Sequence, residues 1–85
     1  MRKLNQIEKH GNIWDIIIRA DDPAHDTIFV MEKYISDELD EDILDFNLEF
    51  RSVGLRKVLD RWDNEIEINA MRVSFIVINT APFSL

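Results

Sequence analysis

The chain has 85 residues, with 17 acidic against 10 basic side chains, two glycines, two prolines and no cysteine. A chain of this length buries only about 60–65% of the surface that its unfolded form exposes, so most of its apolar residues must serve one core, and we expect a single domain. The lack of cysteine excludes disulfides, thiolate zinc sites and cysteine nucleophiles, and the net charge of −7 argues against binding to nucleic acid or anionic membrane, because both need clustered cations.

The first predicted element is a strand at residues 13–19 (IWDIIIR), a segment dense in β-branched and aromatic side chains. Trp14, Ile16 and Ile18 alternate on one face of this strand, and Ile13 and Ile17 lie on the other. Two apolar faces of this kind are typical of a strand inside a fold.

A turn and a second strand are predicted next. Residues 20–26 (ADDPAHD) have the aspartate and proline of a type I turn. Residues 27–35 (TIFVMEKYI) are again rich in β-branched and aromatic side chains. We therefore expect residues 13–19 and 27–35 to form a β-hairpin with a loop of about six or seven residues.

A short helix is predicted at residues 37–44, after Ser36. Apolar residues recur at helical spacing from Leu39 to Phe50, and Asp37 and Glu38 stand where the positive end of a helix dipole favours anions. Residues 45–51 (DFNLEFR) also alternate as a strand does, so both templates compete there. We favour a helix at 37–44 followed by a strand, because Leu48 falls off the face of a continuous helix.

A second helix is predicted to begin after Ser52 and Gly54 and to end at Asp63 and Asn64. Residues 65–68 either extend it or form a short partner strand. Residues 71–80 (MRVSFIVINT) are apolar on both faces in their second half, which is typical of a central strand. Pro82 cannot donate to a ladder, so we expect this strand to stop near residue 80.

These elements predict an α+β fold: a small two-layer sandwich with a three- or four-stranded, mainly antiparallel sheet covered by two helices. The sheet would contain the N-terminal β-hairpin and the C-terminal central strand. Four aromatic residues are expected in the core: Trp14, Phe29, Phe75 and Trp62.

No catalytic or cofactor motif is found. No G-x-S-x-G pattern accompanies the two histidines, and two glycines cannot supply a phosphate-binding loop. Asp21, Asp22, His25 and Asp26 could bind a metal on one loop, but a type I turn explains the same residues. Counted from Asp37, an EF-hand would need glycine and glutamate where Asp42 and Leu48 stand. We therefore expect no enzyme activity, cofactor or metal.

The compartment is predicted from what the chain does not contain. No run of about 18 apolar residues occurs, and the first ten residues lack the apolar centre of a secretory signal. We expect neither a membrane span nor export, and hence a cytoplasmic protein.

The charge is concentrated in one stretch. Residues 21–49 contain eleven acids and one base, Lys33, so they carry −10 while the rest of the chain carries +3. Six of the nine residues from 37 to 45 are acids. On a helix they would present one negative charge per about 2.2 Å, close to the value of about 1.7 Å for duplex DNA.

The acidic stretch predicts a protein-binding surface, although a solvated face that maintains solubility explains it equally simply. The first hypothesis is a stoichiometric inhibitor or antidote, of the immunity-protein, antitoxin or phage anti-defence type, which occupies the basic nucleic-acid-binding surface of a partner protein. The second is an assembly or regulatory subunit that acts by strand addition or as a homodimer. The predicted interface residues are Asp37, Glu38, Asp40, Glu41, Asp42 and Asp45, with Tyr34 at the edge.

Overall fold

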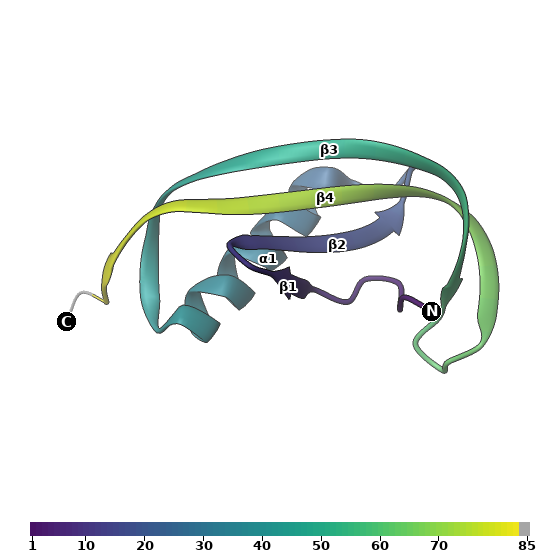
Figure 1. Cartoon of the computed structure of the whole chain (residues 1–85), viewed down its shortest axis with the longest axis horizontal. Coiled ribbons are helices and arrows are strands. Elements are labelled where there is room, and N and C mark those ends of the chain that lie inside the picture. Colours follow the sequence, from purple (N-terminus) through teal and green to yellow (C-terminus); the bar gives the residue numbers. More distant parts are fainter. Residues whose placement is uncertain (84–85) are drawn as a thin grey trace.

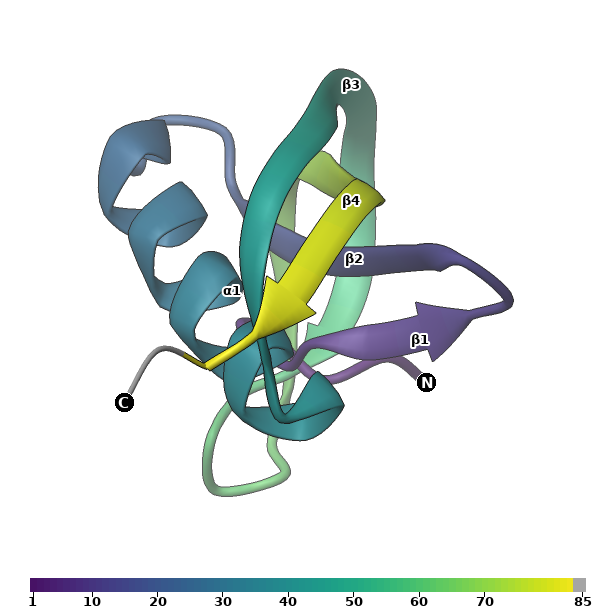
Figure 2. The same ribbon diagram turned by 90° about the vertical axis from the view of Figure 1, so that its left-hand side faces the viewer.

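One helix covers one face of a four-stranded antiparallel sheet in this computed structural model, which describes residues 1–83 (Figure 1 and Figure 2). The strand order in the sheet is β1-β2-β4-β3. The elements are β1 (Glu8–His10), β2 (Ile13–Arg19), α1 (Ala24–Leu39), β3 (Glu41–Leu59) and β4 (Glu65–Pro82). The predicted α+β class and antiparallel sheet are confirmed, but the prediction of two helices is wrong: residues 1–83 contain one.

β2 occupies the predicted residues but has different partners. It pairs with β4, where Trp14 lies opposite Phe75, and with β1, where His10 lies opposite Ile13. Gly11, at φ 64°, is the first residue of the two-residue turn between β1 and β2, the position that favours glycine in a type II′ turn. The predicted hairpin between residues 13–19 and 27–35 is therefore wrong, and the N-terminal hairpin is β1-β2.

Residues 27–35, predicted as a strand, belong to α1. Met31, Ile35 and Leu39 recur at intervals of four and form the side of the helix that packs on the sheet. Burial of this stripe outweighs the local preference of the β-branched residues for a strand. Pro23 occupies the N-cap, and its φ of −65° suits the entry to a helix.

α1 ends where the sequence predicted a helix to begin. Asp40 has φ 56°, a left-handed conformation that stops the helix, and its backbone N–H donates to the carbonyls of Ser36 and Asp37. The predicted helix at residues 37–44 is therefore wrong. Asp37 and Glu38 lie in the last turn of α1 and not in a first turn.

β3 is a single strand of 19 residues. The strand interpretation of residues 45–51 is confirmed, but the helix predicted after Ser52 is wrong, because this segment pairs with β4 as far as Leu59 opposite Glu65. The ladder shifts between Ser52 and Gly54, and Gly54 has φ 70°, so the glycine belongs to a β-bulge. The resulting β3-β4 hairpin forms the long arch in Figure 1.

β4 lies between β2 and β3, which confirms the central position predicted for residues 71–80. It begins at Glu65, so residues 65–68 are strand. It ends at Pro82, which lies opposite Glu41 two residues beyond the expected stop. A proline is tolerated there because it lies at the strand terminus.

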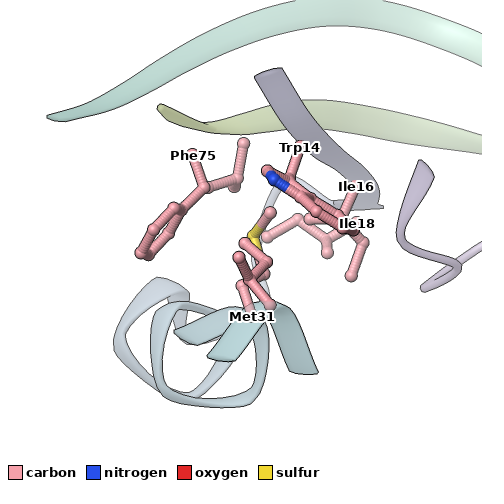
Figure 3. Packing of buried hydrophobic residues seen from close by; sticks show 7 residues of the cluster. Trp14, Ile16, Ile18, Met31 and Phe75 are labelled. Atoms are coloured by element: carbon pink, nitrogen blue, oxygen red, sulfur yellow. The ribbon is translucent and has the colours of Figure 1, made fainter. Parts of the chain in front are cut away.

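The main core lies between α1 and the sheet. Trp14, Ile16 and Ile18 of β2 and Phe75 of β4 point towards Met31 of α1 (Figure 3). The predicted core positions of Trp14 and Phe75 are confirmed.

Phe29 and Trp62 were predicted in the core but are 72% and 68% exposed. Phe29 lies on α1 outside the buried stripe of the helix, and Trp62 lies in the turn between β3 and β4. The Trp62 ring is covered by the guanidinium of Arg61, whose Cζ lies 4.1 Å from the ring centroid.

A smaller core lies on the opposite face of the sheet. Ile17, Val58, Ile68 and Ala70 are buried there, and Leu4 packs against them. The N–H of Leu4 donates to the carbonyl of Leu59 at 2.8 Å, which fixes the N-terminal segment beside the end of β3.

Candidate functional site

Six carboxylates gather where α1 turns into β3, and we call them the acidic surface. They come from the last turn of the helix, the capping residue and the first five residues of β3: Asp37, Glu38, Asp40, Glu41, Asp42 and Asp45. Because the chain reverses at Asp40, the six residues lie on both sides of the bend between α1 and β3, at one end of the arch, and not along one helix (Figure 1).

The members of the acidic surface differ in their freedom to meet a partner. Asp37, Glu38, Asp40 and Asp45 are exposed, and Glu41 and Asp42 are half-buried. Glu41 accepts a hydrogen bond from the hydroxyl of Thr80, which ties it to the fold.

The charges of the acidic surface are not neutralised within the chain. Among residues 1–83 none of the six carboxylates lies within 4 Å of a basic nitrogen. Asp37 and Glu38 stand at the negative end of the helix dipole, and the last turn of α1 contains no basic residue. The local field therefore opposes these charges, the reverse of what the sequence predicted.

Tyr34, predicted at the edge of the interface, lies on another flank of α1. Its ring meets the ring of Trp14 edge-on, with the centroids 6.2 Å apart and the planes at 77°. Lys9 Nζ lies 5.1 Å from the Trp14 centroid. Tyr34 is half exposed, one helical turn before Asp37 and Glu38, but it faces β2 and not Asp45 on β3.

A groove between α1 and β3 adjoins the acidic surface. It has a volume of about 500 Å³ and includes Phe29 and Lys33 from the helix and Asp42, Ile43 and Leu44 from β3. Leu44 is 60% exposed, so two large apolar side chains are open to solvent beside a carboxylate. The sequence interpretation missed Phe29 and Leu44, although the four-residue spacing of Met31, Ile35 and Leu39 places Phe29 outside the buried stripe.

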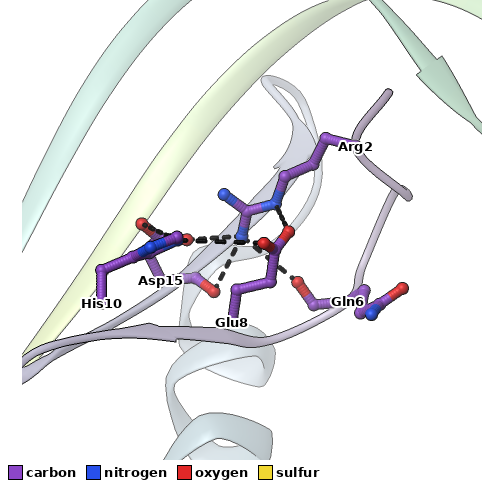
Figure 4. Close-up of polar contacts among 5 residues, drawn as sticks. All are labelled: Arg2, Gln6, Glu8, His10 and Asp15. Carbon is purple, nitrogen blue, oxygen red and sulfur yellow. Dashed lines mark hydrogen bonds and ion pairs between the residues drawn. The ribbon is translucent and has the colours of Figure 1, made fainter.

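A second polar cluster joins the N-terminal segment to the sheet (Figure 4). The guanidinium of Arg2 pairs with the buried carboxylate of Asp15 and with Glu8, and it donates to the Asp15 carbonyl at 3.1 Å. His10 Nε2 lies 3.7 Å from Asp15 and 3.9 Å from Glu8. The charges of Arg2, Glu8 and Asp15 pair with one another, so the cluster fixes the N-terminal segment on the sheet.

The loop considered for a metal does not bring its side chains together. His25 Nε2 lies 3.2 Å from Asp26 in the first turn of α1. No group of three or more histidine, aspartate or glutamate side chains able to hold a metal ion occurs within the described part of the chain.

No helix within residues 1–83 is both long enough and apolar enough to cross a membrane. Comparisons with protein-family models, curated proteins and solved structures find no match to this chain.

Proposed function

We propose that this chain is a small acidic protein-binding module, a stoichiometric inhibitor or antidote that occupies the basic, nucleic-acid-binding surface of a partner protein. The observation that supports the proposal best is the acidic surface, six carboxylates without a basic neighbour among the described residues. A basic partner would supply the missing counter-charges and would be steered towards this end of the molecule.

The position of Asp37 and Glu38 favours an interface over a merely solvated face. A carboxylate at the C-terminal end of a helix is disfavoured by about 0.3–1 kcal/mol, and neutral polar side chains would keep this turn equally soluble. The chain keeps two such carboxylates at a cost in stability. Contact with the cations of a partner would make the two carboxylates stabilising in the complex.

The spacing of the charges on β3 is compatible with a partner built for phosphates. Residues of a regular strand rise about 3.3 Å each, so Asp42 and Asp45 lie at most about 10 Å apart along β3, whose pairing with β4 is irregular between Ile43 and Phe46. Phosphates of one DNA strand rise about 3.4 Å each, so the same distance spans three of them. This comparison replaces the helical spacing of about 2.2 Å expected from the sequence.

The groove beside the acidic surface supplies apolar contacts, which the charges do not. Binding energy at interfaces usually resides in buried aromatic or arginine anchors, whereas charges set orientation and rate. Phe29 and Leu44 are exposed beside Asp42 and can be covered by a partner without rearrangement of the core.

The test uses two variants with equal charge change. Asp37→Lys with Asp45→Lys reverses two exposed members of the acidic surface, and Asp21→Lys with Asp26→Lys reverses two exposed acids elsewhere. Each immobilised protein is used to capture partners from a lysate, and the captured protein is assayed for nucleic-acid binding with and without the parent chain. Thermal denaturation checks that both variants fold.

We expect the Asp21 and Asp26 variant to retain the partner and the Asp37 and Asp45 variant to lose it. One equivalent of the parent chain should displace nucleic acid from that partner, and the association rate should fall as salt rises. Equal capture by the two variants, or a partner that keeps its nucleic acid, would overturn the proposal.

A second candidate function, strand addition or homodimerisation, is favoured by the free edge of β3. β4 is paired on both sides from Ala70 to Ile76, and β1 has only three residues. β3 is the long edge strand, and its register is regular from Phe46 to Ser52. An exposed edge of this kind is a template for another strand.

The charges on β3 fit a second copy of this chain. A two-fold axis through Phe50 would pair Glu49 of each copy with Arg51 of the other and place the half-exposed Phe50 rings opposite one another. An axis through Glu49 would instead oppose two like charges. Of these two registers, the charges favour the one with the axis through Phe50.

A further inference from the structure

Two arginines face each other across the ladder between β3 and β4. Arg51 lies directly opposite Arg72. Leu48 and Val73 pack in the core beneath α1, so by alternation Arg51 and Arg72 belong to the other face of the sheet. Like charges in directly opposed positions destabilise a sheet, and a chain with an excess of acids could easily have placed a carboxylate there.

Arg51 and Arg72, like most lysine and arginine side chains of the described residues, have no ion-pair partner. Arg2 pairs with Asp15 and Glu8, and Lys57 Nζ lies 3.7 Å from Glu65. Within residues 1–83 neither Arg51 nor Arg72 has a carboxylate within 4 Å.

The Nε atom of Arg72 is the stronger indication that this face binds a ligand. In the described part of the chain two buried side-chain polar atoms have no hydrogen-bond partner, the Nε of Arg2 and the Nε of Arg72, and only that of Arg72 also lacks an ion-pair partner. A buried charged donor without an acceptor is strongly disfavoured, so an acceptor from outside the chain is expected.

Arg72 lines two neighbouring hollows on this face. One, of about 470 Å³, also contains Arg51, Ser74 and the carboxylate of Glu49. The other, of about 230 Å³, has an aliphatic floor and a basic rim, formed mainly by Ile17, Val53, Val58, Arg2, Arg56 and Arg72. The Nε of Arg56 donates to the carbonyl of Val53 at 3.3 Å, which holds this side chain over the bulge.

We propose that the smaller hollow binds one phosphate group, held by Arg72 and Arg56 with Arg51 at its side. A volume of about 230 Å³ lies below the usual range of about 300–1,000 Å³ for small-molecule pockets, so it suits a single phosphate or a small phosphomonoester and not a nucleotide. The smaller hollow is lined by four cationic side chains and no carboxylate, which matches a group of charge about −1.5 to −2 better than a single carboxylate. The four are Arg2, Arg56, Lys57 and Arg72. Guanidinium groups bind such oxygens in pairs of parallel hydrogen bonds.

This site is separate from the acidic surface, because Arg51, Arg56 and Arg72 belong to the middle and far part of the β3-β4 hairpin. It explains why an acidic chain concentrates arginines on one face of its sheet. The proposal does not depend on the function proposed for the acidic surface.

The test is a titration of the purified full chain with inorganic phosphate, followed by the NMR signals of the arginine Nε–H groups. We expect a saturable shift that is largest at Arg72. Arg72→Gln and Arg56→Gln should each weaken binding about tenfold or more, as expected from the loss of a charge-assisted contact. Arg61→Gln, in the exposed turn, is the matched control and should leave binding unchanged.

Three further probes complete the test. Saturable binding of phosphoserine or of a phosphoserine peptide would support the site, and tighter binding of the peptide would assign the phosphate to a protein partner. If acetate binds as tightly as phosphate, if all arginine signals shift together without saturation, or if Arg56→Gln binds phosphate as the parent does, the proposal is wrong. Because Arg56 is exposed, its variant remains informative even if Arg72→Gln fails to fold.

Discussion

Asp60 closes the turn between β3 and β4 with its side chain. Its Oδ1 accepts hydrogen bonds from the backbone N–H groups of Asn64 and Trp62, both at 2.9 Å. The hydrogen bond from Asn64, opposed by burial and helped by that from Trp62, holds the pKa of Asp60 below its ordinary value. The ionised carboxylate is thus the form that the folded turn prefers.

Linkage turns this pKa into a prediction for stability. A carboxyl whose pKa is lowered by folding contributes stability that is fully present above its unfolded pKa of about 3.9 and is lost as the pH falls through the folded pKa. Asp60→Ala should therefore be less stable than the parent at pH 7, and the difference should narrow below about pH 4. Urea denaturation across this pH range measures it.

Asp60→Asn is the control for this prediction, since it keeps an oxygen acceptor for the turn without a charge. It should fall between the parent and Asp60→Ala at pH 7. A difference between parent and alanine variant that stays constant down to pH 2 would contradict the assigned role.

The acidic surface shows which features of single residues can be predicted from the sequence and which cannot. The density of acids from Asp37 to Asp45 predicts a charged surface, and the structure places these residues together. The tie between Glu41 and Thr80 joins residues 39 positions apart, so no local pattern predicts it. The exposed position of Phe29 depends on which face of α1 is buried. The interpretation of this segment as a strand could not predict that face.

At the scale of elements, α1 is where local propensity and long-range packing disagree. Its β-branched residues predict a strand, but a helical stripe of Met31, Ile35 and Leu39 is buried beneath β2 and β4. The opposite error occurs after Ser52. Apolar residues there recur at helical spacing, but the segment is a strand, because pairing with β4 satisfies its backbone N–H and C=O groups. The residues of β2 were predicted correctly, although its partners were not, because isoleucines on both of its faces pack in apolar cores and pattern and packing agree.

The end of α1 makes a prediction in which function and stability oppose each other. Asp37→Asn combined with Glu38→Gln removes two anions from the negative end of the helix dipole, so the free energy of unfolding should rise by about 0.5–2 kcal/mol. Urea denaturation at low ionic strength measures this change, and salt should reduce it. Binding to the basic partner should weaken in the same variant.

The same helix provides the matched control. Asp26 lies in the first turn of α1, where an anion is favoured, so Asp26→Asn should lower the free energy of unfolding. If neutralising Asp37 and Glu38 destabilises the protein as Asp26→Asn does, the two carboxylates make favourable contacts within the chain, and their position does not indicate an interface.

At the scale of the whole molecule, the acidic surface and the cations of β3 lie in different parts of the arch. The acidic surface lies at the end where α1 meets β3, whereas Arg56, Lys57 and Arg61 lie towards the turn between β3 and β4 (Figure 1). The molecule extends 44 Å along its longest axis and 23 Å along the other two. Two copies arranged antiparallel along β3 with the axis through Phe50 would place residues 41–45 of each copy beside residues 55–59 of the other, which include Arg56 and Lys57 and no acid.

This arrangement predicts a specific pattern of rescue. In the dimer with its axis through Phe50, Glu49→Arg or Arg51→Glu alone would replace two attractive cross-strand pairs by two repulsive ones. Each favourable pair contributes about 0.2–1 kcal/mol, so the loss of two pairs should weaken dimerisation by about twofold to thirtyfold, and the new repulsion should weaken it further. The double variant restores both pairs with exchanged charges and should dimerise as the parent does.

Light scattering coupled to size exclusion, over a range of protein concentrations, measures all four proteins. A parent chain that stays monomeric at every concentration, or a double variant no better than the singles, would show that the edge of β3 does not pair in this register.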